Sequence, residues 1–369
     1  MFLYTRATLV AGIALSVLKK AARLTKQATG SQGGNVGMRK PFLNVATFSL
    51  VVTLVLAPWS ASALMSSPVT TAKLATLSQV KMINYFPARH VWEAMWTHYE
   101  RAQINNDMAR IHQLNANTVR IIIQPDTIGF PIPRAKMMVR VRDVVQMAKT
   151  HGLQVQLTLF DLWSDYGNLQ GSRTWAQRVL RPFRWDRVVQ SVELKNEIDA
   201  TDPYALAWAK SMIPFVRTVS GQQLVTISPQ ITLDSLMALR EGLQSSQPDY
   251  YTYHYYDAAE DAEARLQNAK EIVGNRPLFI GETGTPSGYG APNAPIDTAA
   301  ENAQLSYLRT VEAAAQTVGL PAAAPWIFQD FAAGTFPAEQ QARYHQGLVR
   351  LDGTSKPIAT WLRSYFLTR

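Results

Sequence analysis

The chain has 369 residues, of which 47% are apolar and 17% are charged, so it can form one large or two ordinary domains with a buried core. It contains no cysteine, which excludes structural disulfides, thiolate metal sites and a cysteine nucleophile. Its formal charge is +9, but residues 1–63 hold seven Lys or Arg and no Asp or Glu, so the remainder carries only +2 and the basicity does not indicate a nucleic-acid-binding face.

The N-terminal 63 residues have the pattern of an export signal. Met38-Arg39-Lys40 is a short positive region, Phe42–Ala57 is an apolar run, and Ala61-Ser62-Ala63 is an Ala-x-Ala cleavage site. We expect cleavage near Ala63 and a periplasmic or secreted product, with an uncleaved membrane anchor as the alternative. Residues 1–37 hold an apolar run of their own, Leu9–Leu18, and the true start is expected at Met38. An organelle transit peptide is the alternative for this acid-poor segment, but two tandem apolar runs suit export better.

Residues 64–78 are rich in Ser, Thr, Ala and Pro and are expected to form a short linker. From residue 79 onward, short apolar runs alternate with longer segments of 3.6-residue period. The apolar runs predict eight strands, at Val80–Phe86, Thr118–Ile123, Val155–Phe160, Val188–Glu197, Leu224–Ser228, Tyr250–Tyr256, Leu278–Glu282 and Pro325–Phe328.

Helices are predicted between these strands by their periodicity and by their start and stop signals. Asp202-Pro203 is typical of a helix N-terminus, and His151-Gly152 is typical of a helix end. The segment Trp163–Asp186 is irregular and is expected to hold an enlarged loop and a helix. The other predicted helices are Ile104–Leu114, Ala135–His151, Tyr204–Ser220, Leu233–Leu243, Glu260–Val273, Thr298–Val318 and a last one from Lys356-Pro357 onward.

Eight strands alternating with helices over residues 79–369 predict a single α/β domain, a (β/α)8 TIM barrel. A doubly wound open sheet alternates in the same way. However, the first strand is not followed by the Gly-rich phosphate-binding turn of that architecture, and the number of strands suits closure. We therefore favour the barrel.

Polar and aromatic residues stand at the ends of the predicted strands, where a barrel of this kind carries its reactive groups. Two of them, Glu197 and Glu282, are the pair of carboxylates that a retaining glycosidase needs, one to donate a proton and one to attack the sugar. The others are Tyr85, Arg120, Gln124, Asp161, Trp163, Asn196, Gln230, His254, Tyr256, Trp326 and Asp330.

These residues resemble the motifs of clan A glycoside hydrolases, and most closely those of family 5, the cellulase and β-mannanase family. The motifs are Asn196-Glu197, His254-Tyr255-Tyr256, Gly281-Glu282 and Trp326, in order on strands four, six, seven and eight. The resemblance spans nearly all of residues 80–365 and implies an enzyme that hydrolyses a β-mannan- or β-glucan-type glycan. Glu197 is followed by Ile198-Asp199 where cellulases commonly have Pro, so the sugar itself is left open.

The predicted mechanism gives the two glutamates different roles. Glu197 is expected to be the general acid/base, with a pKa raised by partial burial and by the facing carboxylate. Glu282 is expected to be the ionised nucleophile, and the two carboxyl groups should lie roughly 5–5.5 Å apart. Glu193, lower on the strand of Glu197, is expected to be a buried structural carboxylate.

Supporting roles are expected for the remaining candidates. Arg120 and Tyr256 should keep Glu282 ionised, and His254 should bind substrate or orient Glu197. Asn196 should donate to the sugar 2-hydroxyl. Aromatic platforms for sugar are expected at Trp326 and Trp163, because an apolar sugar face packs well on an indole ring.

No metal or cofactor is expected, because the sequence has no His-Glu-x-x-His or calcium-loop pattern. The expected partner is a β-linked oligo- or polysaccharide, with no nucleic acid and with membrane contact only through an uncleaved anchor. We expect a monomer. The alternative function is a catalytically inactive glycan-binding barrel or an accessory protein of polysaccharide export, which would share the export signal and the aromatic rim.

Overall fold

The computed structural model describes residues 68–292, 294–336 and 338–369. The predicted export signal, its cleavage site near Ala63 and the alternative start at Met38 lie outside the described residues. The part of the chain that follows residue 62 forms one compact unit. Within the described part, no helix combines the length and the apolar character needed to cross a bilayer.

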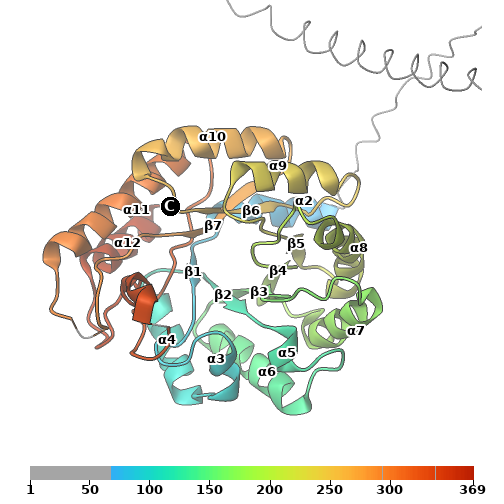
Figure 1. Cartoon of the computed structure of the whole chain (residues 1–369), viewed down its shortest axis with the longest axis horizontal. Helices are drawn as coiled ribbons and strands as arrows, with labels where there is room; N and C mark the ends of the chain where they lie inside the picture. Colours follow the sequence, from blue (N-terminus) through green and yellow to red (C-terminus); the bar gives the residue numbers. More distant parts are fainter. Residues whose placement is uncertain (1–67, 293, 337) are drawn as a thin grey trace, which may run out of the picture. The chain divides into compact units, whose positions relative to one another are not determined.

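Parallel strands at the centre of this unit are surrounded by helices (Figure 1). Five strands are hydrogen-bonded in chain order, and two more form a separate parallel pair. The first set is β1 (Met82–Asn84), β2 (Thr118–Ile122), β3 (Gln154–Thr158), β4 (Val189–Glu193) and β5 (Leu224–Thr226); the pair is β6 (Tyr251–Tyr255) and β7 (Leu278–Thr283).

Two joins close these strands into a barrel. Between β5 and β6, the Asp249 N–H donates to the Val225 carbonyl over 2.8 Å. Between β7 and β1 lies the segment 325–328, where the Trp326 N–H donates to the Thr283 carbonyl (2.8 Å) and the Phe328 N–H donates to that of Asn84 (3.1 Å). An eighth strand was predicted for this segment, but the segment pairs with its neighbours only through isolated β-bridges. A continuous ladder is interrupted at Pro325, which has no N–H to donate. The predicted (β/α)8 barrel is confirmed.

The helices form where the sequence provides apolar faces and caps. Asn168 accepts the Gly171 N–H at the start of α7 and Asp202 accepts the Tyr204 N–H at the start of α8, as N-cap residues do. The helices outside the barrel are α3 (Glu93–Thr97), α4 (Arg101–Gln113), α5 (Pro125–Ile128), α6 (Ala135–Thr150), α7 (Leu169–Leu180), α8 (Pro203–Ser220), α9 (Leu233–Gly242), α10 (Ala262–Val273), α11 (Thr298–Val318) and α12 (Pro357–Thr368), with short 3-10 turns η2 (Arg181–Phe183), η3 (Ala259–Asp261) and η4 (Ala338–His345).

The predicted linker at 64–78 contains regular structure instead. Helix α2 (Pro68–Thr76) leads into the 3-10 turn η1 (Leu77–Gln79). Leu77 joins a small buried cluster made of residues near the starts of the strands, including Met82, Leu224 and Phe279. This apolar surface exists only once the barrel has formed, which is why local composition predicts a loop here. The segment closes the N-terminal end of the barrel.

The packing of α12 against α11 buries an ionisable group. Glu312 of α11 accepts hydrogen bonds from the Ala323 N–H (3.0 Å) and the Tyr365 hydroxyl (2.9 Å). Burial raises the pKa of Glu312 to about 7, although these hydrogen bonds oppose the shift. Because the folded pKa lies above the unfolded one, the stabilisation is complete below the unfolded pKa and is lost as the pH rises through about 7.

We therefore predict that Glu312→Gln flattens the pH dependence of stability. Between about pH 5 and pH 8 the wild type should lose up to about 3 kcal/mol of unfolding free energy relative to the variant. Denaturant unfolding at several pH values measures this difference. The exposed Glu263 offers the control, since Glu263→Gln should leave the pH dependence of the wild type intact. Equal profiles for wild type and Glu312→Gln would contradict the assignment.

Candidate active site

Arg120 stands at the centre of the site. It is the third residue of β2, paired in register with Asn84, and its side chain is fully buried. Arg120 was predicted to lie at the end of this strand, but it lies two residues before the end. Its long side chain nevertheless carries the guanidinium up to the C-terminal end of the barrel. It donates to the side chains of Asn84 (3.0 Å), Thr158 (3.0 Å), Glu193 (2.7 Å), Asn196 (2.7 Å) and Glu282.

Glu193 is the structural partner of Arg120. It is the last residue of β4, is fully buried, and accepts from both Arg120 and the Thr158 hydroxyl (2.6 Å). The prediction of a buried, paired structural carboxylate is confirmed. One guanidinium thus lies between two carboxylates, Glu193 and Glu282, and a buried charge needs this kind of pairing.

Glu197 lies beyond the end of β4. The strand was predicted to reach this residue, but its ladder ends at Glu193 and irregular pairing with the segment after β5 continues, as in the Ile198–Ser228 backbone hydrogen bond of 2.9 Å. Glu197 has φ +46°, an uncommon conformation for a residue with a side chain, and its N–H donates to the Ser228 hydroxyl over 3.0 Å. This turn directs the carboxylate inward while leaving its side chain 38% exposed.

Glu282 lies within β7 and is nearly buried. Its Oε1 contacts Arg120, and its Oε2 accepts from the Tyr256 hydroxyl over 2.8 Å, so both predicted contacts are present. Burial and the charge of Glu282 raise the pKa of Tyr256 well above its usual value, so its hydroxyl stays a donor. The preceding Gly281 is required by space, because an added Cβ would lie 2.0 Å from the Thr252 side chain.

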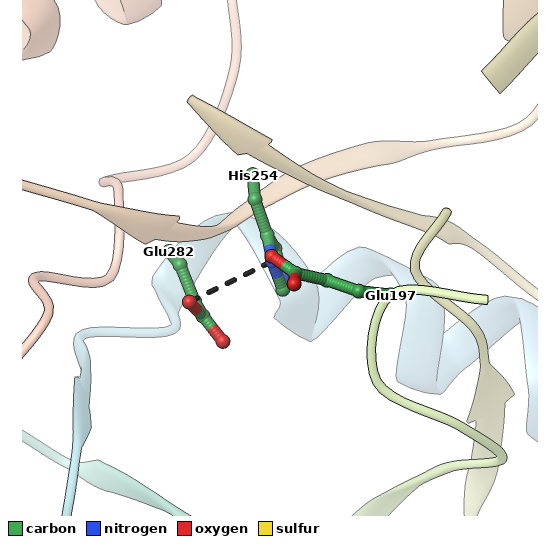
Figure 2. Close-up of side chains that lie close together, drawn as sticks. All are labelled: Glu197, His254 and Glu282. Atoms are coloured by element: carbon green, nitrogen blue, oxygen red, sulfur yellow. Dashed lines mark hydrogen bonds and ion pairs between the residues drawn. The ribbon is translucent and has the colours of Figure 1, made fainter. Parts of the chain in front are cut away.

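Glu197, from the segment after β4, His254 of β6 and Glu282 of β7 converge on one point (Figure 2). His254 of β6 is fully buried, and its Nδ1 lies 2.8 Å from Oε1 of Glu197 and 3.6 Å from Oε2 of Glu282. One carboxylate oxygen from each glutamate and a ring nitrogen of His254 lie within 4.8 Å of one another. The two glutamates therefore face the same space at the same end of the barrel.

The charges of this cluster shift its pKa values. Burial lowers the pKa of His254, but the negative charges of Glu282 and Glu197 outweigh this and leave it raised. Burial raises the pKa of Glu197, but the hydrogen bond and charge of His254 outweigh this and leave it lowered. The expectation of a raised pKa for Glu197 is therefore wrong, because His254 compensates the facing carboxylate.

The same three residues could ligate a metal ion by their composition. Their contacts disfavour it. Nδ1 of His254 is directed at Glu197, and Glu282 is held by the permanently charged Arg120, which would repel a divalent cation. The arrangement instead places the pair of His254 and Glu197, which can share a proton, opposite the Glu282 carboxylate. Glu282 is held by the Arg120 guanidinium and the Tyr256 hydroxyl.

The aromatic candidates divide into one at the rim and one in the core. Trp326 follows β7 in space, is partly exposed, and packs beside Trp92 with ring centroids 6.5 Å apart. Trp163 is only 6% exposed and lies 4.2 Å from the ring centre of Phe130. Its surface is used in packing a loop, so the structure does not support Trp163 as a sugar platform.

Two contacts in the site were not anticipated. Asn196, predicted to bind the sugar, accepts from Arg120 through its oxygen, while its amide nitrogen lies 3.4 Å from Asp161. Ser228 holds the Glu197 N–H. No local motif marks Ser228, because its role depends on the pairing of two irregular segments.

A comparison with protein families finds one match over more than half of the chain. The model described as Cellulase (glycosyl hydrolase family 5) matches residues 80–318. No curated protein matches the sequence.

Several solved glycosidases have a similar fold. The exo-β-1,4-mannosidase Op5Man5 from Opitutaceae bacterium strain TAV5 is 20% identical with a TM-score of 0.63, covering 78% of this chain and 59% of that one. GH5_18 from Streptomyces cattleya, a variant in complex with Manβ1-4GlcNAc, is 14% identical with a TM-score of 0.64, covering 78% and 80%. The β-D-glucuronidase of Dictyoglomus thermophilum is 13% identical with a TM-score of 0.57, covering 73% and 48%. This chain thus spans less than two thirds of the first and last of these proteins.

We predict that Arg120→Met lowers the unfolding free energy by about 3–5 kcal/mol, because it leaves Glu193 and Glu282 buried without a counter-ion. Denaturant unfolding measures the change. Arg101→Met is the control, since Arg101 pairs with Asp143 but is 64% exposed, and it should lower the unfolding free energy far less than Arg120→Met does. Similar losses for both variants would contradict the central place of Arg120.

Proposed function

The chain belongs to glycosyl hydrolase family 5 and is a glycosidase that acts on carbohydrate. From this premise we propose that it is a retaining β-glycosidase that uses Glu197 and Glu282. The observation that carries the proposal is the facing pair of carboxylates, with one oxygen of each within 4.8 Å of the other. The carboxyl groups lie about 5–5.5 Å apart in retaining enzymes and about 6.5–9.5 Å apart in inverting ones, so this close approach of the oxygens favours the retaining arrangement. Family membership does not favour the alternative of an inactive glycan-binding barrel.

In the first step, Glu282 attacks the anomeric carbon and forms a glycosyl ester, while the bond to the leaving oxygen breaks. The leaving oxygen takes a proton from Glu197. Contacts from Arg120 and the Tyr256 hydroxyl hold the attacking carboxylate in one orientation beside a positive charge. Glu282 loses its negative charge when it becomes an ester. Arg120 and the Tyr256 hydroxyl remain in place and stabilise the carboxylate when it is released in the second step.

The proton for this step belongs to the pair of His254 and Glu197. Because the pKa of His254 is raised and that of Glu197 is lowered, the proton rests on the imidazole in the free enzyme. Over the 2.8 Å between Nδ1 and Oε1 it can pass to Glu197 as the leaving oxygen gains charge. The exposed part of Glu197 delivers it to the substrate.

In the second step a water molecule attacks the glycosyl ester. The deprotonated Glu197 takes the proton of this water, the bond to Glu282 breaks, and the sugar leaves with its β configuration retained. The pair gave up its proton in the first step, and the loss of the Glu282 charge in the ester removes the largest charge effect that raises the pKa of His254. The pair therefore stays deprotonated in the ester, and Glu197 is free to accept the proton of the water.

Two residues are proposed to hold the reacting sugar. The amide nitrogen of Asn196 makes only a 3.4 Å contact with Asp161, so it can turn its second N–H to the 2-hydroxyl. The indole of Trp326, buttressed by Phe86 and Trp92, would lie under the ring.

For the substrate, we propose a β-linked mannan- or glucan-type glycan and place mannosides first. Support comes from the similar folds of Op5Man5, a β-1,4-mannosidase, and GH5_18, which was solved with Manβ1-4GlcNAc. The N-terminal sequence supports action outside the cytoplasm, since Met38-Arg39-Lys40 and Phe42–Ala57 have the pattern of an export signal.

Chemical rescue tests the two roles. On aryl β-mannosides and aryl β-glucosides with a good leaving group, Glu197→Ala and Glu282→Ala should each lower kcat by at least about a hundredfold. Added azide should restore turnover of Glu197→Ala and yield a β-glycosyl azide, because azide needs no base to attack the glycosyl ester. An α-glycosyl azide from Glu197→Ala, or full activity of either variant, would overturn the assignment.

The pH profile tests the shared proton. His254→Gln keeps a hydrogen-bond donor near Glu197 but cannot carry the proton, so the proton must rest on Glu197 alone. The alkaline limb of kcat/KM should therefore move to lower pH, because a carboxylic acid loses its proton below the raised pKa of His254. An alkaline limb that stays in place or moves upward would show that His254 does not hold the proton.

A further inference from the structure

A group of exposed arginines lies apart from the site. Residues 173–187 contain five arginines and one aspartate, a net +4, whereas residues 64–369 as a whole carry +2. Arg178, Arg181, Arg184 and Arg187, here called the arginine patch, are exposed, and within the described residues none of them forms an ion pair. The aspartate between them, Asp186, faces Lys149 at 3.9 Å. The small net charge of residues 64–369 therefore conceals a local concentration of positive charge on this surface.

The arginine patch lies at the end of the barrel opposite Glu197 and Glu282. It spans the last turn of α7, the turn η2 and the segment that enters β4, so it stands where strands begin. Three of its arginines line a hollow together with Gln177 and Val219. Trp185, 71% exposed, projects beside them, with the Arg184 guanidinium 5.1 Å from its ring centre.

Helix α2, the first described element, reaches the same surface. The Lys73 ammonium group contacts the carbonyl oxygen of Gln222, and an added Cβ on the neighbouring Gly221 would lie 2.6 Å from the Arg184 carbonyl oxygen. The turn at 221–222 therefore touches α2 on one side and the arginine patch on the other. Burial and the charge of Arg187 lower the pKa of Lys73, which places a further basic group beside the patch.

The sequence that precedes α2 indicates what this surface faces. The apolar run Phe42–Ala57 is separated from Pro68 by ten residues, which span at most about 35 Å when fully extended. An apolar run of this kind engages a lipid bilayer during export or as an anchor. The described chain enters the barrel at the end that carries the arginine patch, and an uncleaved apolar run would hold this end within about 35 Å of a bilayer.

We propose that the arginine patch, with Lys73 and Trp185, docks on the anionic surface of a lipid bilayer. Arginine binds phosphate headgroups through several N–H donors, and tryptophan is enriched at the level of the headgroups. A bilayer fits better than an acidic polysaccharide, because an exposed tryptophan beside arginines suits the level of the headgroups and the apolar run before α2 suits a bilayer. Docking would turn the catalytic end of the barrel away from the membrane and toward glycan.

Vesicle binding tests this proposal with residues 64–369, which hold the closed barrel and its core and lack the apolar run. We expect co-sedimentation with vesicles of phosphatidylcholine containing about 30% phosphatidylglycerol, no binding to pure phosphatidylcholine, and release by added NaCl. The triple variant Arg178→Gln, Arg181→Gln, Arg184→Gln should bind at least about tenfold more weakly, because each basic residue near an anionic surface adds to the attraction.

The matched control is Arg142→Gln, Arg309→Gln, Arg363→Gln, which removes the same charge from exposed positions on α6, α11 and α12. It should change vesicle binding by less than about threefold, since these positions lie outside the patch. An unchanged midpoint of thermal unfolding shows that each variant is folded. Equal loss in both triple variants, or no binding of the wild type to either vesicle, would overturn the proposal. Patch-dependent binding to polygalacturonate in place of vesicles would assign the surface to an acidic glycan and would overturn it as well.

Discussion

The buried guanidinium of Arg120 is the constraint on which the site depends. It joins β2 to β1, β3, β4 and β7 through five side chains and lies between two carboxylates. A lone carboxylate at the position of Glu282 would be expensive to bury in its charged form. With Glu193 and Glu282 sharing one cation, the group carries a single net negative charge, and it is held in one orientation. Glu282, the proposed nucleophile, therefore stands on a rigid support that is also part of the core of the barrel.

The second glutamate is held in a different way. Glu197 lies outside the ladder of β4 on a residue with φ +46°, and its side chain is 38% exposed. Glu197 is paired with His254, which can exchange a proton, whereas Glu282 is paired with Arg120, which is permanently charged. This asymmetry suits a division of labour in which one carboxylate stays ionised and the other changes its protonation state twice in each cycle.

The two ends of the barrel have distinct characters. The C-terminal ends of the strands hold the buried charges and Trp326 at the rim. The N-terminal end is closed by the apolar cluster around Leu77, Met82 and Phe279, and its outer surface carries exposed arginines. In a parallel barrel all strands share one direction, so chemistry at one end leaves the other free for packing and for contacts with large partners. A change at the arginine patch can therefore leave the geometry around Glu282 intact.

The order and spacing of apolar runs determined an α/β domain with a buried parallel sheet, and the number of runs together with the missing Gly-rich turn favoured closure into a (β/α)8 barrel. The same pattern placed Glu197, His254 and Glu282 at one end, because residues at the ends of parallel strands share an edge. Only the tertiary structure decided the partners of Arg120, the burial of Trp163 and the sign of the pKa shift of Glu197. These depend on atoms brought together from residues 33 to 162 positions apart, and a through-space distance is not encoded in any local pattern.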